Sequence, residues 1–83
     1  MDRYLFTARS VTHAQQMARE LERAGIHVRV RRVSGSGAMR GCGYTLEVSE
    51  RQFAVAGEIL RASKTRPVKV FRVSGGQTVE VVE

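Results

Sequence analysis

The stretch RYLFTARSVTHAQQMARELERAGIHVRVRRV, residues 3–33, contains the patterns of a strand, a helix and a second strand, in that order. Aromatic residues and Thr make 3–8 suitable for a pleated strand. Ser10 offers an N-cap to the helix, in which apolar side chains recur with the spacing of one helical face. Gly25 ends this helix, because glycine readily adopts the left-handed conformation that follows a helical C-terminus. Apolar and basic residues then alternate over 26–33, which predicts a half-buried strand.

The second half of the chain has the same order of patterns. Residues 44–48 predict a third strand, and 67–73 predict a fourth. Between them, Ser49 and Gln52 have the spacing of a capping box that opens a second helix. Gly57 lies inside this helix, where glycine costs about 1 kcal/mol relative to alanine. We therefore expect the helix to approach the sheet closely at Gly57.

An internal repeat relates the two halves. Residues 28–35 (VRVRRVSG) match residues 68–75 (VKVFRVSG) at an offset of 40 (68 − 28). The match is either a chance agreement between valine-rich strands or the mark of two β-α-β units. Two such units predict an α+β, ferredoxin-like β-α-β-β-α-β fold, whose antiparallel four-stranded sheet has the order 4-1-3-2 and carries both helices on one face. The chain is then a single domain, 1–83, with 74–83 as a tail or a fifth edge strand.

Length and charge limit the classes of function. The chain has 83 residues, so its core is thin, and we expect neither a large substrate cleft nor an enclosed cofactor. No apolar run approaches the roughly 18 residues of a membrane span. The N-terminal Met-Asp-Arg lacks the basic-then-apolar pattern of a signal segment, so we expect a cytoplasmic protein without a membrane partner. Lys and Arg number 14 against 8 Asp and Glu. The net charge of +6 either attracts an anionic partner or only keeps the protein soluble.

Cys42 is the single cysteine of the chain, which excludes an internal disulfide and a Cys-x-x-Cys motif. In the expected sheet, the end of the first strand lies beside the start of the third. This topology predicts that Cys42 lies near the start of the first helix, close to Ser10, Thr12 and His13. Free N–H groups at a helix start lower the pKa of a nearby thiol and favour the thiolate.

The immediate neighbours of Cys42 favour the same chemistry. Gly41 and Gly43 leave the sulfur without bulky neighbours in sequence, and Arg40 adds a positive charge. The connection at 64–66 brings one Lys and one Arg to the same end of the sheet. The alternative is a buried cysteine that acts as a small apolar filler, which is common for this residue. No His and acid stand at metal-ligand spacing with the cysteine, so we expect no metal and no other cofactor.

Several short motifs resemble those of a family of very small bacterial selenium/sulfur carrier-like proteins, a domain otherwise of unknown function. The motifs are YLFT at 4–7, Ser10 with Ala14 at a helix start, AGI at 24–26 and GCG at 41–43. The resemblance covers about residues 3–73. The sequence departs from the family at 32–34, where RVS replaces an expected Pro-Arg segment, and in a longer, glycine-rich loop before the cysteine.

The resemblance implies a non-enzymatic carrier that holds sulfur or selenium on Cys42 as a persulfide or perselenide. A cysteine desulfurase-type protein would be the donor, and a further protein would be the acceptor. Arg40 and His13 would stabilise the anion. Two alternatives remain open: a small regulatory or protein-interaction module in which the cysteine is structural, and a basic module that binds nucleic acid through its +6 charge and arginines such as Arg29 and Arg31. A homo-oligomer is compatible with the sequence as well.

Overall fold

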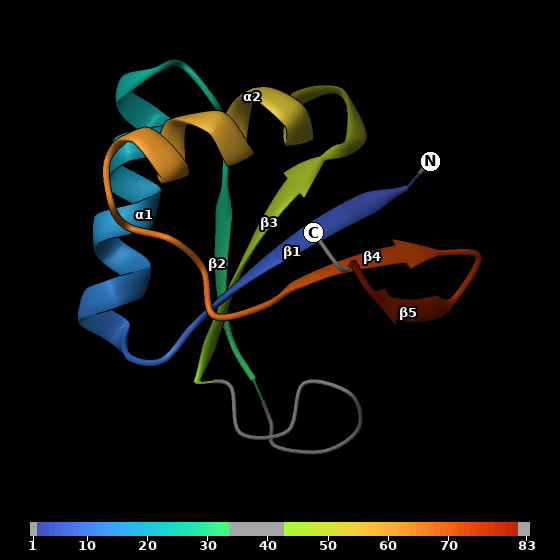
Figure 1. The fold of residues 1–83 in the computed structure, drawn as a ribbon. Coiled ribbons are helices and arrows are strands. Elements are labelled where there is room, and N and C mark those ends of the chain that lie inside the picture. Colours follow the sequence, from blue (N-terminus) through green and yellow to red (C-terminus); the bar gives the residue numbers. More distant parts are fainter. Residues whose placement is uncertain (1, 34–42, 82–83) are drawn as a thin grey trace.

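The computed structural model describes residues 2–33 and 43–81 of the chain. These residues form a five-stranded antiparallel sheet and two helices (Figure 1). The elements in chain order are β1 (Arg3–Ala8), α1 (Val11–Arg23), β2 (Arg29–Arg32), β3 (Tyr44–Ser49), α2 (Glu50–Ala62), β4 (Val70–Ser74) and β5 (Gln77–Glu80). The prediction of a small α+β protein with two helices on an antiparallel sheet is therefore confirmed.

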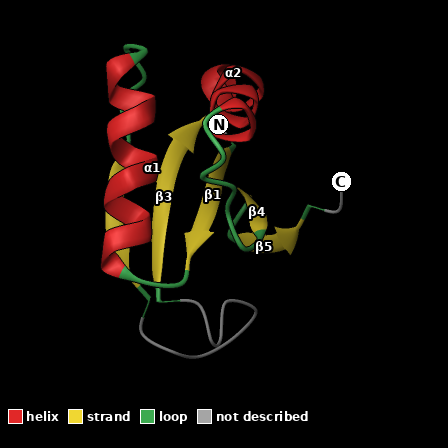
Figure 2. Cartoon of the chain, turned by 60° about the vertical axis from the view of Figure 1, so that its left-hand side comes forward, coloured by secondary structure: helices red, strands yellow, loops and turns green. Residues whose placement is uncertain are grey.

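The order of the sheet is β2-β3-β1-β4-β5, which puts β1 at its centre. β1 pairs with β3 along its whole length, from Arg3 opposite Ser49 to Ala8 opposite Tyr44. Both helices lie on one face of the sheet (Figure 2) and share a core with strand residues of that face, such as Phe6. Because β1 and β3 run antiparallel, the end of β1 and the start of β3 meet at one end of this core.

α1 begins and ends where its sequence predicts. The Ser10 hydroxyl accepts a hydrogen bond from the His13 N–H at 3.1 Å, which satisfies one of the free donors of the first turn. Gly25 follows the helix with a φ of 84°. The N–H of Ile26 then donates to the Leu21 carbonyl at 3.0 Å, so the chain turns back onto the helix.

The predictions for β2 and for the start of α2 differ from the structure. β2 is shorter than 26–33, and all four of its residues are exposed. Among the described strands, β2 is an edge strand paired with β3 alone, and the buried side chains of this segment, Ile26 and Val28, precede the strand. The capping box of α2 does not form, because the side chain of the N-cap Ser49 makes no capping hydrogen bond.

The expected fifth strand is present and begins at Gln77. Gly75 and Gly76 join it to β4 with φ values of 56° and 82°. Positive φ at both central positions belongs to the type I′ turn, which suits the twist of a two-residue β-hairpin. The hairpin extends the sheet beyond the part that the helices cover (Figure 1).

The segment that leads into β4 is fastened to β1 by Thr7, which is fully buried. The Thr7 hydroxyl accepts from the Lys69 N–H at 2.7 Å and donates to the Lys69 carbonyl at 3.1 Å. The Val68 N–H donates to the Thr7 carbonyl at 2.9 Å. β4 starts at Val70 rather than at Pro67, since proline has no N–H to donate to a strand ladder. Thr7 therefore fixes residues 67–69 against the centre of the sheet.

We predict that Thr7→Val lowers the free energy of unfolding by about 1–3 kcal/mol, because it removes the buried hydroxyl to which the Lys69 N–H donates. Equilibrium unfolding in urea measures this change. Thr45→Val is the matched control: Thr45 is buried opposite Thr7 and its side chain bonds to no described residue. Equal effects of the two substitutions would contradict the role of Thr7.

Candidate functional site

The start of β3 is held against the end of β1. The N–H of Gly43 donates to the Ala8 carbonyl at 3.1 Å, and a Cβ at Gly43 would lie only 3.2 Å from the carbonyl oxygen of Arg9. A larger residue would need the backbone before α1 to shift. Gly43 thus lies beside the residues that lead into α1.

Cys42, Gly41 and Arg40 lie outside the described residues. Their predicted positions near the first helix are therefore not tested by the structure. Of the candidate site, the structure describes Gly43 and the residues at the start of α1.

The residues at the start of α1 have defined partners. Ser10 uses its hydroxyl to cap the helix, and Thr12 is exposed on the first turn. His13 is buried, and both of its ring nitrogens are engaged: Nδ1 lies 3.3 Å from the amide nitrogen of Arg9, and Nε2 lies 3.0 Å from the Arg66 carbonyl oxygen. This pattern assigns the proton to Nε2, because Nδ1 must accept. His13 therefore joins the first turn of α1 to the connection after α2.

Basic side chains gather beside His13 in a hollow of about 630 Å³, which we call the cationic pocket. The sequence places Lys64 and Arg66 at this end of the sheet, and the structure brings them together there with Arg9. Among the described residues that line the hollow there is no carboxylate. The full lining is Arg9, His13, Gln16, Arg61, Lys64, Thr65 and Arg66. Sequence analysis missed Arg9 and Arg61, because only the packing of α1 against α2 places them here.

The backbone of Lys64 has an unusual conformation, with a φ of 61°. The N–H of Thr65 donates to the Leu60 carbonyl at 3.2 Å, so α2 ends with the same motif as α1. α1 has Gly25 at the corresponding position, where glycine carries no steric penalty. A side chain in the left-handed region costs roughly 1–2 kcal/mol. The chain therefore accepts local strain to hold a lysine at the cationic pocket.

We predict that Lys64→Gly raises the free energy of unfolding by about 0.5–1 kcal/mol, since relief of the strain exceeds the added entropy of the unfolded chain. The melting temperature should rise by about 2–8 °C. Lys64→Ala removes the same charge but keeps a Cβ at a left-handed position. An equal rise for both variants would assign the gain to charge instead of backbone strain.

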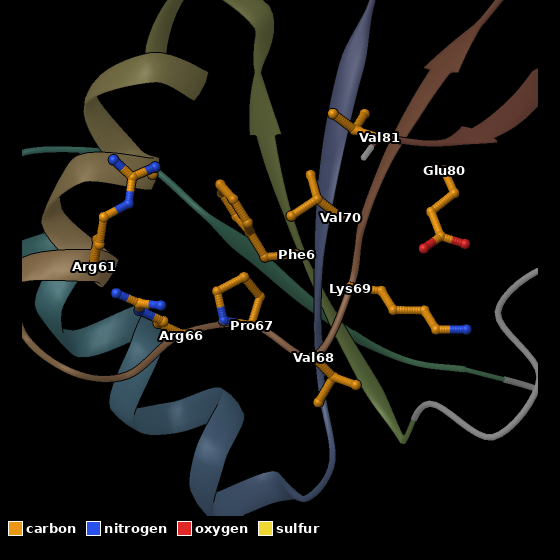
Figure 3. A pocket seen from close by; sticks show the side chains of 10 residues that line it. Phe6, Arg61, Arg66, Pro67, Val68, Lys69, Val70, Glu80 and Val81 are labelled. Atoms are coloured by element: carbon orange, nitrogen blue, oxygen red, sulfur yellow. The ribbon is translucent and has the colours of Figure 1, made fainter. Parts of the chain in front are cut away.

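A second hollow of about 340 Å³, the apolar pocket, lies between α2, β1 and the segment before β4. Its lining combines apolar residues with four charged ones, and Figure 3 shows Arg61 and Arg66 on one side of it and Lys69 and Glu80 on the other. Its lining is Phe6, Gly57, Arg61, Arg66, Pro67, Val68, Lys69, Val70, Glu80 and Val81.

Gly57 does not mark a close approach of α2 to the sheet, so that prediction is wrong. A Cβ built at Gly57 has no atom within 4 Å, and the residue lines the apolar pocket. The α-helix loses about 1 kcal/mol by carrying glycine here in place of alanine. Because Gly57 has no side chain, the apolar pocket stays open at this position.

The arginines of β2 are partly neutralised on the face of the sheet away from the helices. Glu47 lies opposite Arg29 in the β2–β3 pairing. Its carboxylate lies 3.3 Å from Nη1 of Arg3 and 4.0 Å from Nε of Arg31. A phosphate backbone that approaches this face would therefore meet a carboxylate among the arginines, which weakens the case for a nucleic-acid stripe there.

A scan of protein-family models and searches of curated proteins and of solved structures found no match to the chain. The resemblance to selenium/sulfur carrier-like proteins rests on the short motifs alone. Neither helix of the described residues is long and apolar enough to cross a bilayer. Within the same residues, no three metal-ligating side chains gather into a group that could hold an ion.

Proposed function

We propose that the protein is a ferredoxin-like carrier of sulfur or selenium, which holds the transferred atom on Cys42 and does not itself catalyse a reaction. The single observation that supports this most is the contact of Gly43 with Ala8 and Arg9. Gly43 is bonded to Cys42, and neighbouring Cα atoms lie about 3.8 Å apart across a trans peptide. On this proposal the thiol operates close to the beginning of α1.

The charge at this end of the molecule supports the same chemistry. Arg9, Lys64 and Arg66 approach one another at the cationic pocket, and none of them forms an ion pair with a described carboxylate. Positive potential stabilises a thiolate relative to a thiol. A persulfide is more acidic than a thiol, and positive potential also stabilises the anionic form of the Cys42 persulfide. This favours the sulfur-loaded protein over release of the sulfur into solution.

The transfer is a thiol–persulfide exchange. The Cys42 thiolate attacks the outer sulfur of a donor persulfide and forms a new S–S bond. The donor S–S bond breaks, and the donor cysteine leaves as a thiolate while the outer sulfur keeps its proton. Attack by an acceptor thiolate on the same outer sulfur then regenerates the Cys42 thiolate. Each step conserves charge and needs no added oxidant. Selenium follows the same course.

We predict that incubation with a cysteine desulfurase and cysteine adds sulfur to Cys42. Intact-mass spectrometry should detect the gain of one sulfur atom, and addition of a thiol reductant should reverse it. Cys42→Ser provides the control, because it removes the only thiol of the chain. A Ser variant that gains the same mass, or a wild-type protein that accepts no sulfur while the desulfurase is active, would contradict the proposal.

A second prediction concerns the reactivity of the thiol. If the start of α1 and the nearby cations act on Cys42, its pKa in the folded protein lies below the ordinary value of about 8.5. Alkylation by iodoacetamide requires the thiolate, so its rate should rise with pH around a lower midpoint in the folded protein than in the urea-unfolded chain. Burial would have the opposite effect and would raise the pKa. A midpoint at or above that of the unfolded chain would make Cys42 a structural residue.

A further inference from the structure

The cationic and apolar pockets are neighbours that share a wall. Arg61 and Arg66 line both hollows, one from the last turn of α2 and the other from the connection to β4. A ligand that passes between these two side chains would therefore have one part in each hollow. Binding of such a ligand depends on these lining residues alone and is independent of the proposed carrier function.

The cationic pocket has the features of a site for a multiply charged anion. Lys64 and Arg66 approach from the end of α2, and Arg9 approaches from the start of α1. These three exposed cations are not neutralised by a described carboxylate. The amide of Gln16 adds neutral hydrogen-bonding capacity. A single arginine can bind a carboxylate through two hydrogen bonds. A phosphate dianion has enough acceptor oxygens to bind several cations at once.

The positions of these cations are held by hydrogen bonds of the backbone. The Arg66 carbonyl bonds to the His13 ring, and the following residues are fastened to Thr7. Lys64 adopts its left-handed conformation although glycine would fit the turn without strain. Side chains on such a fixed frame lose less freedom when they bind a ligand than side chains of a flexible loop.

The apolar pocket is suited to an uncharged group attached to that anion. Phe6, Pro67, Val70 and Val81 line it (Figure 3), and its volume of about 340 Å³ lies in the range of small-molecule sites. The missing side chain of Gly57 leaves this space open. Glu80 stands at the side away from the arginines, and the Lys69 side chain, which lines the same hollow, extends to that side as well.

We propose that the two hollows together bind a small organic phosphate, with the phosphate among Arg9, Lys64 and Arg66 and a flat apolar ring against Pro67 and Val70. The ligand class is that of aryl and nucleoside monophosphates.

The test is a titration of the ¹⁵N-labelled full chain, followed by amide chemical shifts, with phenyl phosphate, inorganic phosphate and phenol at one ionic strength. Phenyl phosphate should bind at least about tenfold more tightly than inorganic phosphate, because only it buries a ring. Its shifts should include Lys64 and Thr65 together with Gly57 and Val70. Equal affinity for the two phosphates, or no saturable shifts with phenyl phosphate, would overturn the proposal.

Two variants separate the halves of the site. Lys64→Gly should weaken phenyl phosphate binding about five- to tenfold while the protein remains folded. Gly57→Leu should reduce the affinity for phenyl phosphate to that for inorganic phosphate and leave the latter unchanged, because the added side chain fills only the apolar pocket. Gly57→Ala, which fills less of it, should keep a preference for phenyl phosphate.

Arg19→Ala is the control for net charge, since Arg19 is exposed on α1 and lines neither pocket. It should change the affinity by less than about twofold. An equal loss in Arg19→Ala and Lys64→Gly would mean that only the overall charge attracts the anion. Tighter binding of a short single-stranded oligonucleotide than of phenyl phosphate, with a steep dependence on salt, would assign the surface to nucleic acid instead.

Discussion

The antiparallel pairing of β1 with β3 is the constraint on which the rest of the structure depends. It sets Ala8 opposite Tyr44, so the end of one central strand lies beside the beginning of the other. α1 must then start where β3 starts. α2 leaves the far end of β3 and returns, which delivers its C-terminal turn to the same place. The basic residues before α1, in α2 and after α2 therefore meet at this one end of the sheet.

Sequence patterns predicted those features that depend on a few neighbouring residues. Ser10 and Gly25 limit α1 as expected, because a hydroxyl cap and a left-handed glycine act within one turn of a helix. The Gly75-Gly76 turn similarly requires only its own two residues. The capping box at Ser49 failed although its spacing is correct, since a cap also depends on how the strand delivers the residue to the helix.

The pockets could not be predicted in this way. Arg9 and Lys64 are far apart in the chain, and nothing in their own sequence neighbourhoods links them. Gly57 has an ambiguous pattern: a glycine in a helix can allow a close contact or leave a space, and only the surrounding structure decides between the two. Cys42 was found by its uniqueness and by topology. The structure describes its neighbour Gly43, and Cys42 itself lies outside the described residues.

The exposed edge formed by β2 has a consequence for how copies of the protein meet. In the described part of the sheet, one side of Arg29–Arg32 has no strand beside it, and such an edge is a template for edge-to-edge aggregation. Two copies that joined by this edge would set arginines against arginines, and like charges opposite one another are unfavourable. The other edge, β5, ends in an acidic residue and has no such cluster. The arginines of β2 thus act against fibril-like stacking at high protein concentration, whatever ligand or partner the other surfaces bind.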